Sequence, residues 1–312
     1  MPALKDFARC ECLPAVQVGR VAKLAVMGMS FEAESGNEEA VPELPWRLAD
    51  IDFARLEHEK VRSDDTLYFV LATSALVEAA THHYASNLIE YYAGDAELAA
   101  WLRTNWQPEE LQHGAALRAY VEAVWPEFSW ERAFGGFFPE YAAACTQEEL
   151  EPSRALEMAA RCVVETGTAT MYQMLHDYSD EPVLRAITAH LKSDEVRHYS
   201  YFYDAYRRYC AEHGRPARWR VARAELRRVL EAFDDDGDIA FRHAWNGRYP
   251  ERPSTAADYK AFQRNLRARI TPKLPVTMST KMLLKPLALP ARVNGWAVAL
   301  VSGVLRLAAG RP

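Results

Sequence analysis

Long segments of this 312-residue chain are apolar on most faces of a helix and contain almost no charge. Within residues 66–89 the only formally charged side chain is Glu78, and within residues 162–176 the only one is Glu165. No alternation of apolar and polar residues is long enough for a β-strand, and no internal repeat is found. The pattern therefore predicts an all-α fold in which two helices are largely buried.

Capping residues and prolines mark where the central helices begin and end. Ser63 or Asp64 can cap a helix that continues to about Tyr92, where Gly94 ends it, and Asp95 can cap the next helix. Prolines at a first helical turn favour three further helices, at 108–124, 152–177 and 182–212. The first of these prolines is alternatively a kink within one longer helix.

The remaining segments have weaker patterns. Helices are predicted at 217–233, 255–269 and 292–309. Two segments rich in Gly, Pro or Asp, 127–150 and 234–253, are predicted to be connections.

These elements divide the chain into three parts. Residues 1–62 have no sustained period and are predicted to form an irregular N-terminal arm. Residues 63–213 are predicted to form a four-helix core, and residues 214–312 a helical C-terminal extension with a basic tail, packed on that core.

Composition and charge narrow the classes of function. Hydrophobic residues make up 49% and charged residues 26%, as in ordinary globular proteins, and a net charge of −6 argues against general nucleic-acid binding. Five cysteines do not make a disulfide scaffold, and Cys10 and Cys12 are too close together and too isolated for a zinc site. Neither a secretory signal nor a membrane-spanning segment is convincing, so we expect a cytoplasmic protein.

Charge is distributed unevenly along the chain. No Asp or Glu follows Asp258, whereas ten Lys and Arg residues do, so residues 1–258 carry a net charge of −16 and the tail carries +10. Three roles for the tail are considered: docking of an acidic carrier protein, peripheral attachment to a membrane surface, and simple packing of a final helix on the bundle. A homodimer is also compatible with the sequence.

Two short motifs add imidazoles to the two lone carboxylates. Glu110 and His113, and likewise Glu195 and His198, are three residues apart, so each pair lies on one face of a helix. Either motif alone is common by chance. Their order is informative, because a lone Glu, an E-x-x-H pair, a lone Glu and a second E-x-x-H pair fall on four successive predicted helices, as in dinuclear carboxylate sites of helix bundles.

We therefore predict a dinuclear metal site. Its candidate ligands are Glu78, Glu110, His113, Glu165, Glu195 and His198. A buried ionised carboxylate is unfavourable unless it is paired or binds a metal, and two divalent cations neutralise four carboxylates. Carboxylate and imidazole ligands favour iron or manganese. The alternative for each lone glutamate is a protonated side chain or a pair with an arginine.

Around these ligands the sequence resembles the ferritin-like di-iron oxidases, and most closely the soluble acyl-carrier-protein desaturases. That family carries E-E-N-R-H-G and D-E-K-R-H, and the chain has E-E-L-Q-H-G from Glu109 to Gly114 and D-E-V-R-H from Asp194 to His198. The resemblance covers roughly residues 63–213. It implies a ferritin-like four-helix bundle that binds two iron ions, Fe/Fe rather than Mn/Fe.

The resemblance also implies roles for residues beside the ligands. In the segment E-T-G-T that begins at Glu165, Thr168 matches a family threonine that helps to deliver protons; alternatively it packs or bonds to the preceding turn. Asp194 is the expected partner of His113, and Arg197 is expected to fix Asp194 or a ligand glutamate. Lone histidines are usually structural, so packing roles are expected for His82, His83 and His190.

The implied activity is that of an O2-dependent di-iron oxidase or oxygenase. It would abstract hydrogen from an aliphatic substrate, such as a carrier-bound fatty acyl chain, in a desaturation or hydroxylation, with electrons from a ferredoxin-type or flavin-reductase donor. The apolar residues nearest the ligands on their helices are Leu71, Ala75, Met171 and Leu175. The alternatives are non-enzymatic iron storage, an aldehyde-deformylating oxygenase, and an arylamine N-oxygenase, although Leu191 stands where that last family has an additional histidine.

Overall fold

The computed structural model describes residues 44–231 and 235–310. All of these residues belong to one compact unit of the chain. The regular structure in these residues is helical and includes no strand, which confirms the predicted all-α fold. Among the same residues, a search for helices able to span a membrane finds no candidate.

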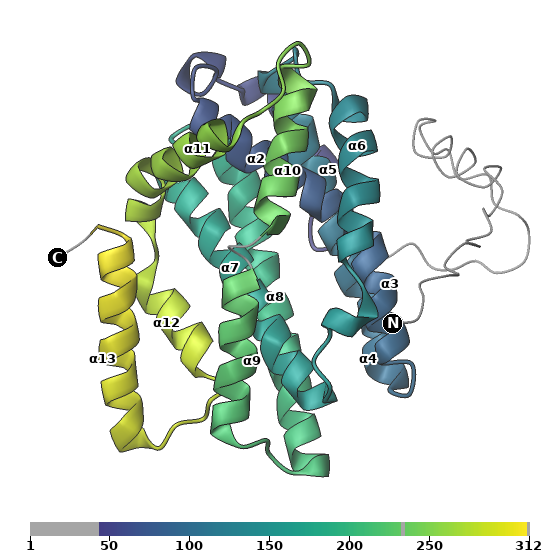
Figure 1. Ribbon diagram of the computed structural model, residues 1–312, viewed down its shortest axis with the longest axis vertical. Helices are drawn as coiled ribbons and strands as arrows, with labels where there is room; N and C mark the ends of the chain where they lie inside the picture. Colours follow the sequence, from purple (N-terminus) through teal and green to yellow (C-terminus); the bar gives the residue numbers. More distant parts are fainter. Residues whose placement is uncertain (1–43, 232–234, 311–312) are drawn as a thin grey trace, which may run out of the picture. The chain divides into compact units, whose positions relative to one another are not determined.

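The helices follow one another along the chain with short connections (Figure 1). In order they are α2 (Asp65–Ala79), α3 (Thr81–Tyr91), α4 (Ala96–Trp101), α5 (Gln107–Val124), α6 (Trp130–Ala144), α7 (Arg154–Tyr178), α8 (Pro182–His213), α9 (Arg218–Glu231), α10 (Asp235–Arg248), α11 (Ala256–Arg269), α12 (Val276–Leu284) and α13 (Ala291–Ala308). Short 3-10 turns lie at Leu48–Asp50, Phe53–Arg55, His58–Lys60, Gln147–Glu149 and Thr271–Lys273, and a π-helical turn lies at Leu102–Trp106.

Most helix ends coincide with the signals in the sequence. The carboxylate of Asp64 accepts a hydrogen bond from the backbone N–H of Leu67 at the start of α2 (3.1 Å), and Asp95 caps α4 through the N–H of Leu98 (3.2 Å). Pro182 occupies the first turn of α8. The three weaker helices predicted after residue 213 are confirmed as α9, α11 and α13.

The prediction of one helix ending near Tyr92 is wrong. The N–H of Ala80 donates to the carbonyl of Val77 (3.0 Å), one residue short of α-helical spacing, and this tight turn separates α2 from α3. Conversely, α4, the π-helical turn and α5 run without a break, so Pro108 lies inside a longer helical segment, as the alternative interpretation held.

The two segments predicted to be connections also contain helices, α6 and α10, and that prediction is wrong as well. These helices pack against each other, and a Cβ at Gly136 would lie only 2.7 Å from Nδ1 of His243. Gly136, which in the sequence indicates a break in a helix, therefore allows the close contact between α6 and α10. α10 is held on α2 by Phe241, whose ring centroid lies 4.7 Å from that of Phe69.

Buried apolar side chains form two main clusters that meet in the middle of the long helices. Along the π-helical turn and α5, one cluster ends at Trp106 and the other begins at Ala116; along α8 the clusters are separated between Leu191 and Tyr199. Both E-x-x-H motifs fall in these gaps. The polar residues are therefore enclosed by apolar packing toward both ends of the bundle. α7 and α8 run side by side through this region (Figure 1).

The C-terminal helices attach to the same unit. The hydroxyls of Thr170 on α7 and Ser279 on α12 lie 2.8 Å apart, and α13 packs in turn on α12. α12 had no counterpart among the predicted elements.

Candidate metal centre

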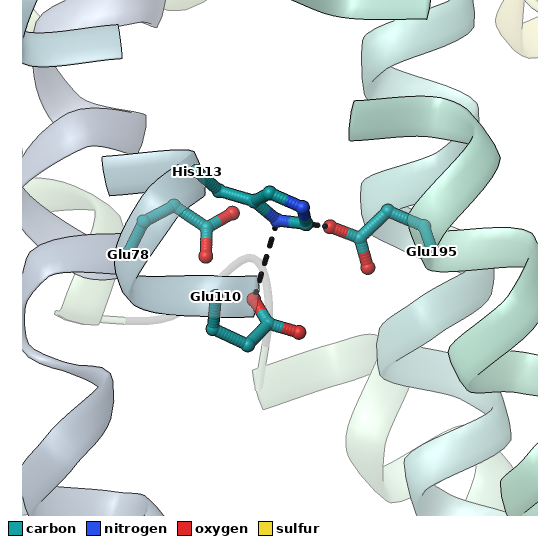
Figure 2. Close-up of side chains that lie close together, drawn as sticks. All are labelled: Glu78, Glu110, His113 and Glu195. Atoms are coloured by element: carbon teal, nitrogen blue, oxygen red, sulfur yellow. Dashed lines mark ion pairs between the residues drawn. The ribbon is translucent and has the colours of Figure 1, made fainter. Parts of the chain in front are cut away.

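The six candidate ligands converge from four helices. They are Glu78 from α2, Glu110 and His113 from α5, Glu165 from α7, and Glu195 and His198 from α8. At most 5% of any of these residues is exposed. Figure 2 shows the carboxylates of Glu78, Glu110 and Glu195 gathered around the imidazole of His113. The structure thus brings together all the residues that the sequence selected.

The ligand atoms form two overlapping groups, in each of which they all lie within 4.8 Å of one another. One group contains Glu78 and His113 and the other contains Glu165 and His198, while Glu110 and Glu195 belong to both. Two shared carboxylates, with a further carboxylate and an imidazole on each side, could hold a pair of neighbouring cations.

The inward-facing histidine nitrogens have acceptors nearby but no hydrogen bond. Nδ1 of His113 lies 3.2 Å from Oε1 of Glu195, and Nδ1 of His198 lies 3.1 Å from Oε1 of Glu110. Both Nδ1 atoms, Oε2 of Glu165 and Oε1 of Glu195 are nevertheless buried without a hydrogen-bond partner among the described residues. Unsatisfied buried polar atoms are rare in folded proteins, and here four of them lie in one cluster. This donor set fits metal ions better than it fits a closed hydrogen-bond network.

The outward-facing nitrogens are held by acids from the opposite motif. Nε2 of His113 lies 3.0 Å from Oδ2 of Asp194, which directly precedes Glu195, and Nε2 of His198 lies 2.7 Å from Oε2 of Glu109, which directly precedes Glu110. Each motif therefore orients the histidine of the other. Such a contact fixes the tautomer and leaves Nδ1 available as a ligand.

The pairing of His113 with Asp194 is the one that the resemblance implied. The role of Glu109 was missed, although its position in its motif matches that of Asp194 and offered a signal. Arg197 lies 2.9 Å from Oδ1 of Asp194 and also pairs with Glu109, so one guanidinium links both supporting acids.

Trp46 reaches the same network from the segment predicted to be an N-terminal arm. Its indole Nε1–H donates to Oδ2 of Asp194 (2.7 Å), and its backbone carbonyl accepts from Nε2 of Gln112 (2.9 Å). Its ring also stacks on His190 at 4.9 Å. No feature of the sequence around Trp46 indicated this contact.

Two hydroxyl groups donate to candidate ligands from α7. Oγ1 of Thr168 lies 2.8 Å from Oε2 of Glu195 and also contacts the carbonyls of Val164 and Glu165 at 3.2 Å, so both interpretations of this residue are compatible with its position. The hydroxyl of Tyr172, one turn further along, donates to Oε1 of Glu78. Tyr172 was not selected from the sequence, although it lies on the same helix face as Thr168.

Gly114 directly follows His113 and lets α5 approach α2 closely. A Cβ at this position would lie 2.7 Å from the backbone nitrogen of Ala79 and 3.0 Å from the carbonyl carbon of Glu78. A larger residue would therefore push the two helices apart. The glycine places Glu78 opposite the ligands of α5.

The cluster changes the proton affinity of its members. Burial raises the pKa of Glu78 well above its usual value, with neighbouring carboxylates adding to the effect, and burial also raises the pKa of Glu165 well above its usual value. Burial alone would lower the pKa of His113 and His198, but their Nε2 contacts with Asp194 and Glu109, together with the nearby carboxylates, raise both well above the usual range. Contacts with the two histidines lower the pKa of Glu110 and Glu195 against the effect of burial, so protons on the other members would compete with cations for the same atoms.

The remaining histidines lie outside both ligand groups. The ring of His82 stacks on Phe138 at 5.2 Å, and Nε2 of His83 contacts the carbonyl of Ala142 at 3.1 Å, in keeping with packing roles. Cys10 and Cys12 lie outside the described residues.

Of the four apolar residues nearest the candidate ligands on their helices, Leu71, Ala75 and Leu175 belong to one apolar cluster, and Met171 packs against it. A surface hollow of about 680 Å³ lies elsewhere, between α3, α4 and the start of α5. Its lining includes Gln107, one helical turn before Glu110.

Comparison of the chain with protein-family models gives no match. Comparison with curated proteins gives none either.

Proposed function

We propose that this chain is a ferritin-like di-iron protein whose six candidate ligands hold two iron ions. The observation that carries the proposal is the convergence of buried donor atoms without hydrogen-bond partners. Each such atom is unfavourable by about 1–3 kcal/mol when left unsatisfied, and two cations at this place would satisfy all of them together. The carboxylate and imidazole donors suit iron or manganese, and the resemblance to di-iron oxidases favours Fe/Fe.

The proposed activity is O2-dependent oxidation of an aliphatic substrate, by desaturation or hydroxylation. When bound, a pair of iron ions supplies O2 activation, with electrons from an external ferredoxin-type or flavin-reductase donor. The residues of the chain orient this chemistry: Glu110 and Glu195 reach both ligand groups, and Thr168 is placed to hold a proton at Oε2 of Glu195. Apolar packing toward both ends of the site excludes water.

Iron stoichiometry tests the metal site directly. Aerobic addition of Fe(II) to metal-free protein is expected to give two irons per chain and the absorption band of a bridged ferric pair. Glu165→Gln is expected to bind fewer than two irons. Glu225→Gln, which changes a buried glutamate outside the ligand set, should keep two. One or no iron bound by the unchanged chain would overturn the proposal.

The same titration separates the enzyme from iron storage. A storage protein would take up many irons per chain and would sediment as a large multiple of 35.4 kDa. The oxidase is expected to stop at two irons and to consume O2 with an acyl chain, presented free or on an acidic carrier protein, when a reductase system is supplied. If protein loaded with two irons oxidises neither form of the substrate, the proposed activity is wrong and the proposed metal site still stands.

A further inference from the structure

Helix α13 presents a stripe of large apolar side chains to solvent. The exposed fractions are 82% for Trp296, 70% for Leu300 and 75% for Leu307, with Val293 and Val304 exposed as well. Spacings of three and four residues place all five on one face of the helix. We call this set the α13 stripe.

The opposite face of α13 is occupied by the protein itself. Oγ1 of Thr280 on α12 lies 3.0 Å from Oγ of Ser302, and Leu305 packs against a small apolar cluster that contains Leu274 and Val276. In Figure 1, α13 lies beside α12. Packing on the bundle therefore explains one face of α13 and leaves the stripe unexplained.

The stripe is unusual among the residues that the structure describes. Five of the ten large apolar side chains exposed there belong to it. A shallow hollow of about 410 Å³ runs along it, lined by Trp296, Ala299, Leu300, Gly303, Val304 and Leu307. Contiguous exposed apolar surface of this kind marks a docking face.

The charges around the stripe have one sign. The charged side chains of α13 are Arg292 and Arg306, which are exposed at its two ends. Among the ion pairs of the described residues, none involves either arginine, and no acid follows Asp258 in the sequence. A partner that fits this face therefore has an apolar interior that accepts the stripe and negative charge at its surface.

These charges argue against a second copy of the chain as the occupant. In an antiparallel pair of α13 helices, Arg292 of one copy would face Arg306 of the other, and in a parallel pair each arginine would face itself. Like charges at a contact are unfavourable. An anionic lipid surface presents phosphates above acyl chains, which matches both the arginines and the stripe.

We propose that α13 lies in the surface of a bilayer that contains anionic phospholipid. The stripe enters the boundary between headgroups and acyl chains, and the arginines extend to the phosphates. This inference goes beyond the proposed oxidation and does not depend on the metal site.

Vesicle flotation of the full chain tests the proposal. Binding is expected to vesicles of phosphatidylcholine mixed with phosphatidylglycerol, and it should weaken with salt and with phosphatidylcholine alone. The double variant Leu300→Ser, Leu307→Ser should lower the partition coefficient about tenfold or more, because it removes the two leucines that insert.

A matched control removes two exposed leucines from another helix. Leu226 and Leu230 on α9 are 58% and 55% exposed, so Leu226→Ser, Leu230→Ser makes the same chemical change elsewhere. The control should bind vesicles like the unchanged chain, and circular dichroism should show both variants folded. Equal binding by all three proteins, or loss in the α9 variant alone, would overturn the proposal.

Two further measurements address charge and the rival occupant. Arg292→Glu, Arg306→Glu should abolish the preference for anionic vesicles without unfolding the protein, since both side chains are exposed. Sedimentation equilibrium should give the same mass for the unchanged chain and the α13 leucine variant. Self-association that the leucine variant abolishes would overturn the proposal in favour of a second copy.

Discussion

Helix α7 carries two glutamates, Glu157 and Glu165, that are equally buried but have opposite surroundings. Oε1 of Glu157 accepts a hydrogen bond from Nε of Arg161 (3.0 Å), and its Oε2 accepts one from the backbone N–H of Glu151 (2.8 Å). Oε2 of Glu165 has no hydrogen bond, and Nδ1 of His198 lies 3.5 Å away. Burial therefore does not distinguish these two glutamates, whereas the hydrogen bonds of their carboxylates do.

The largest expected effect comes from loading the unsatisfied site. Iron or manganese should stabilise the chain by about 4 kcal/mol per ion at a free concentration about a thousand times the dissociation constant, or about 8 kcal/mol for two ions. Thermal unfolding of metal-free and loaded protein measures this as a rise in Tm. Glu165→Gln should reduce the gain, and identical Tm values with and without metal would contradict the comparison.

Exchanging the two glutamates for glutamine should separate them in metal-free protein. Glu157→Gln leaves Arg161 without its charged partner and should lower the free energy of unfolding by about 3–5 kcal/mol. Glu165→Gln should leave it unchanged or raise it, because a poorly satisfied carboxylate is removed. Urea unfolding measures both, and equal losses in the two variants would show that both carboxylates are structural.

A smaller effect is expected where helix spacing supports the site. Gly114→Ala places a methyl group against the backbone of α2 and should cost about 1–3 kcal/mol, with weaker metal binding through Glu78. Gly167→Ala is the matched control, because no heavy atom would lie within 4 Å of its Cβ, and it should be neutral or stabilising by up to about 1 kcal/mol. Calorimetry with and without metal compares them, and equal losses would contradict this role of Gly114.

The smallest effect concerns Glu225, a third buried glutamate, which lies outside the candidate ligand set and forms no ion pair with any residue that the structure describes. Burial raises the pKa of Glu225 from 4.5 to about 8. Between these values the folded chain holds a proton that the unfolded chain lacks, so stability should fall as pH rises through this window, by about 1–2 kcal/mol after relaxation. Glu225→Gln should flatten this part of the profile of Tm against pH, and an unchanged slope would show that the group titrates normally.

The sequence was sufficient to select the six residues that the structure brings together, because each of them leaves a local mark in the sequence. A single charge in an apolar helix and a three-residue spacing are visible without knowing what packs on what. Trp46 leaves no such mark, since its partner Asp194 is 148 positions away. Helices α6 and α10 were missed for a related reason. Gly136 lowers the helix propensity of α6, and its advantage is seen only when α6 packs on His243 of α10.

Each histidine is oriented by an acid from the opposite helix, and this bears on how the candidate centre forms during folding. Because Glu109 orients His198 and Asp194 orients His113, neither α5 nor α8 presents a correctly aimed imidazole until the other is in place. When only the first half of the chain has left the ribosome, His113 lacks both its partner Asp194 and the helices that later surround it. Because of these reciprocal contacts, both halves of the bundle must have met before the two histidines are oriented for binding a cation.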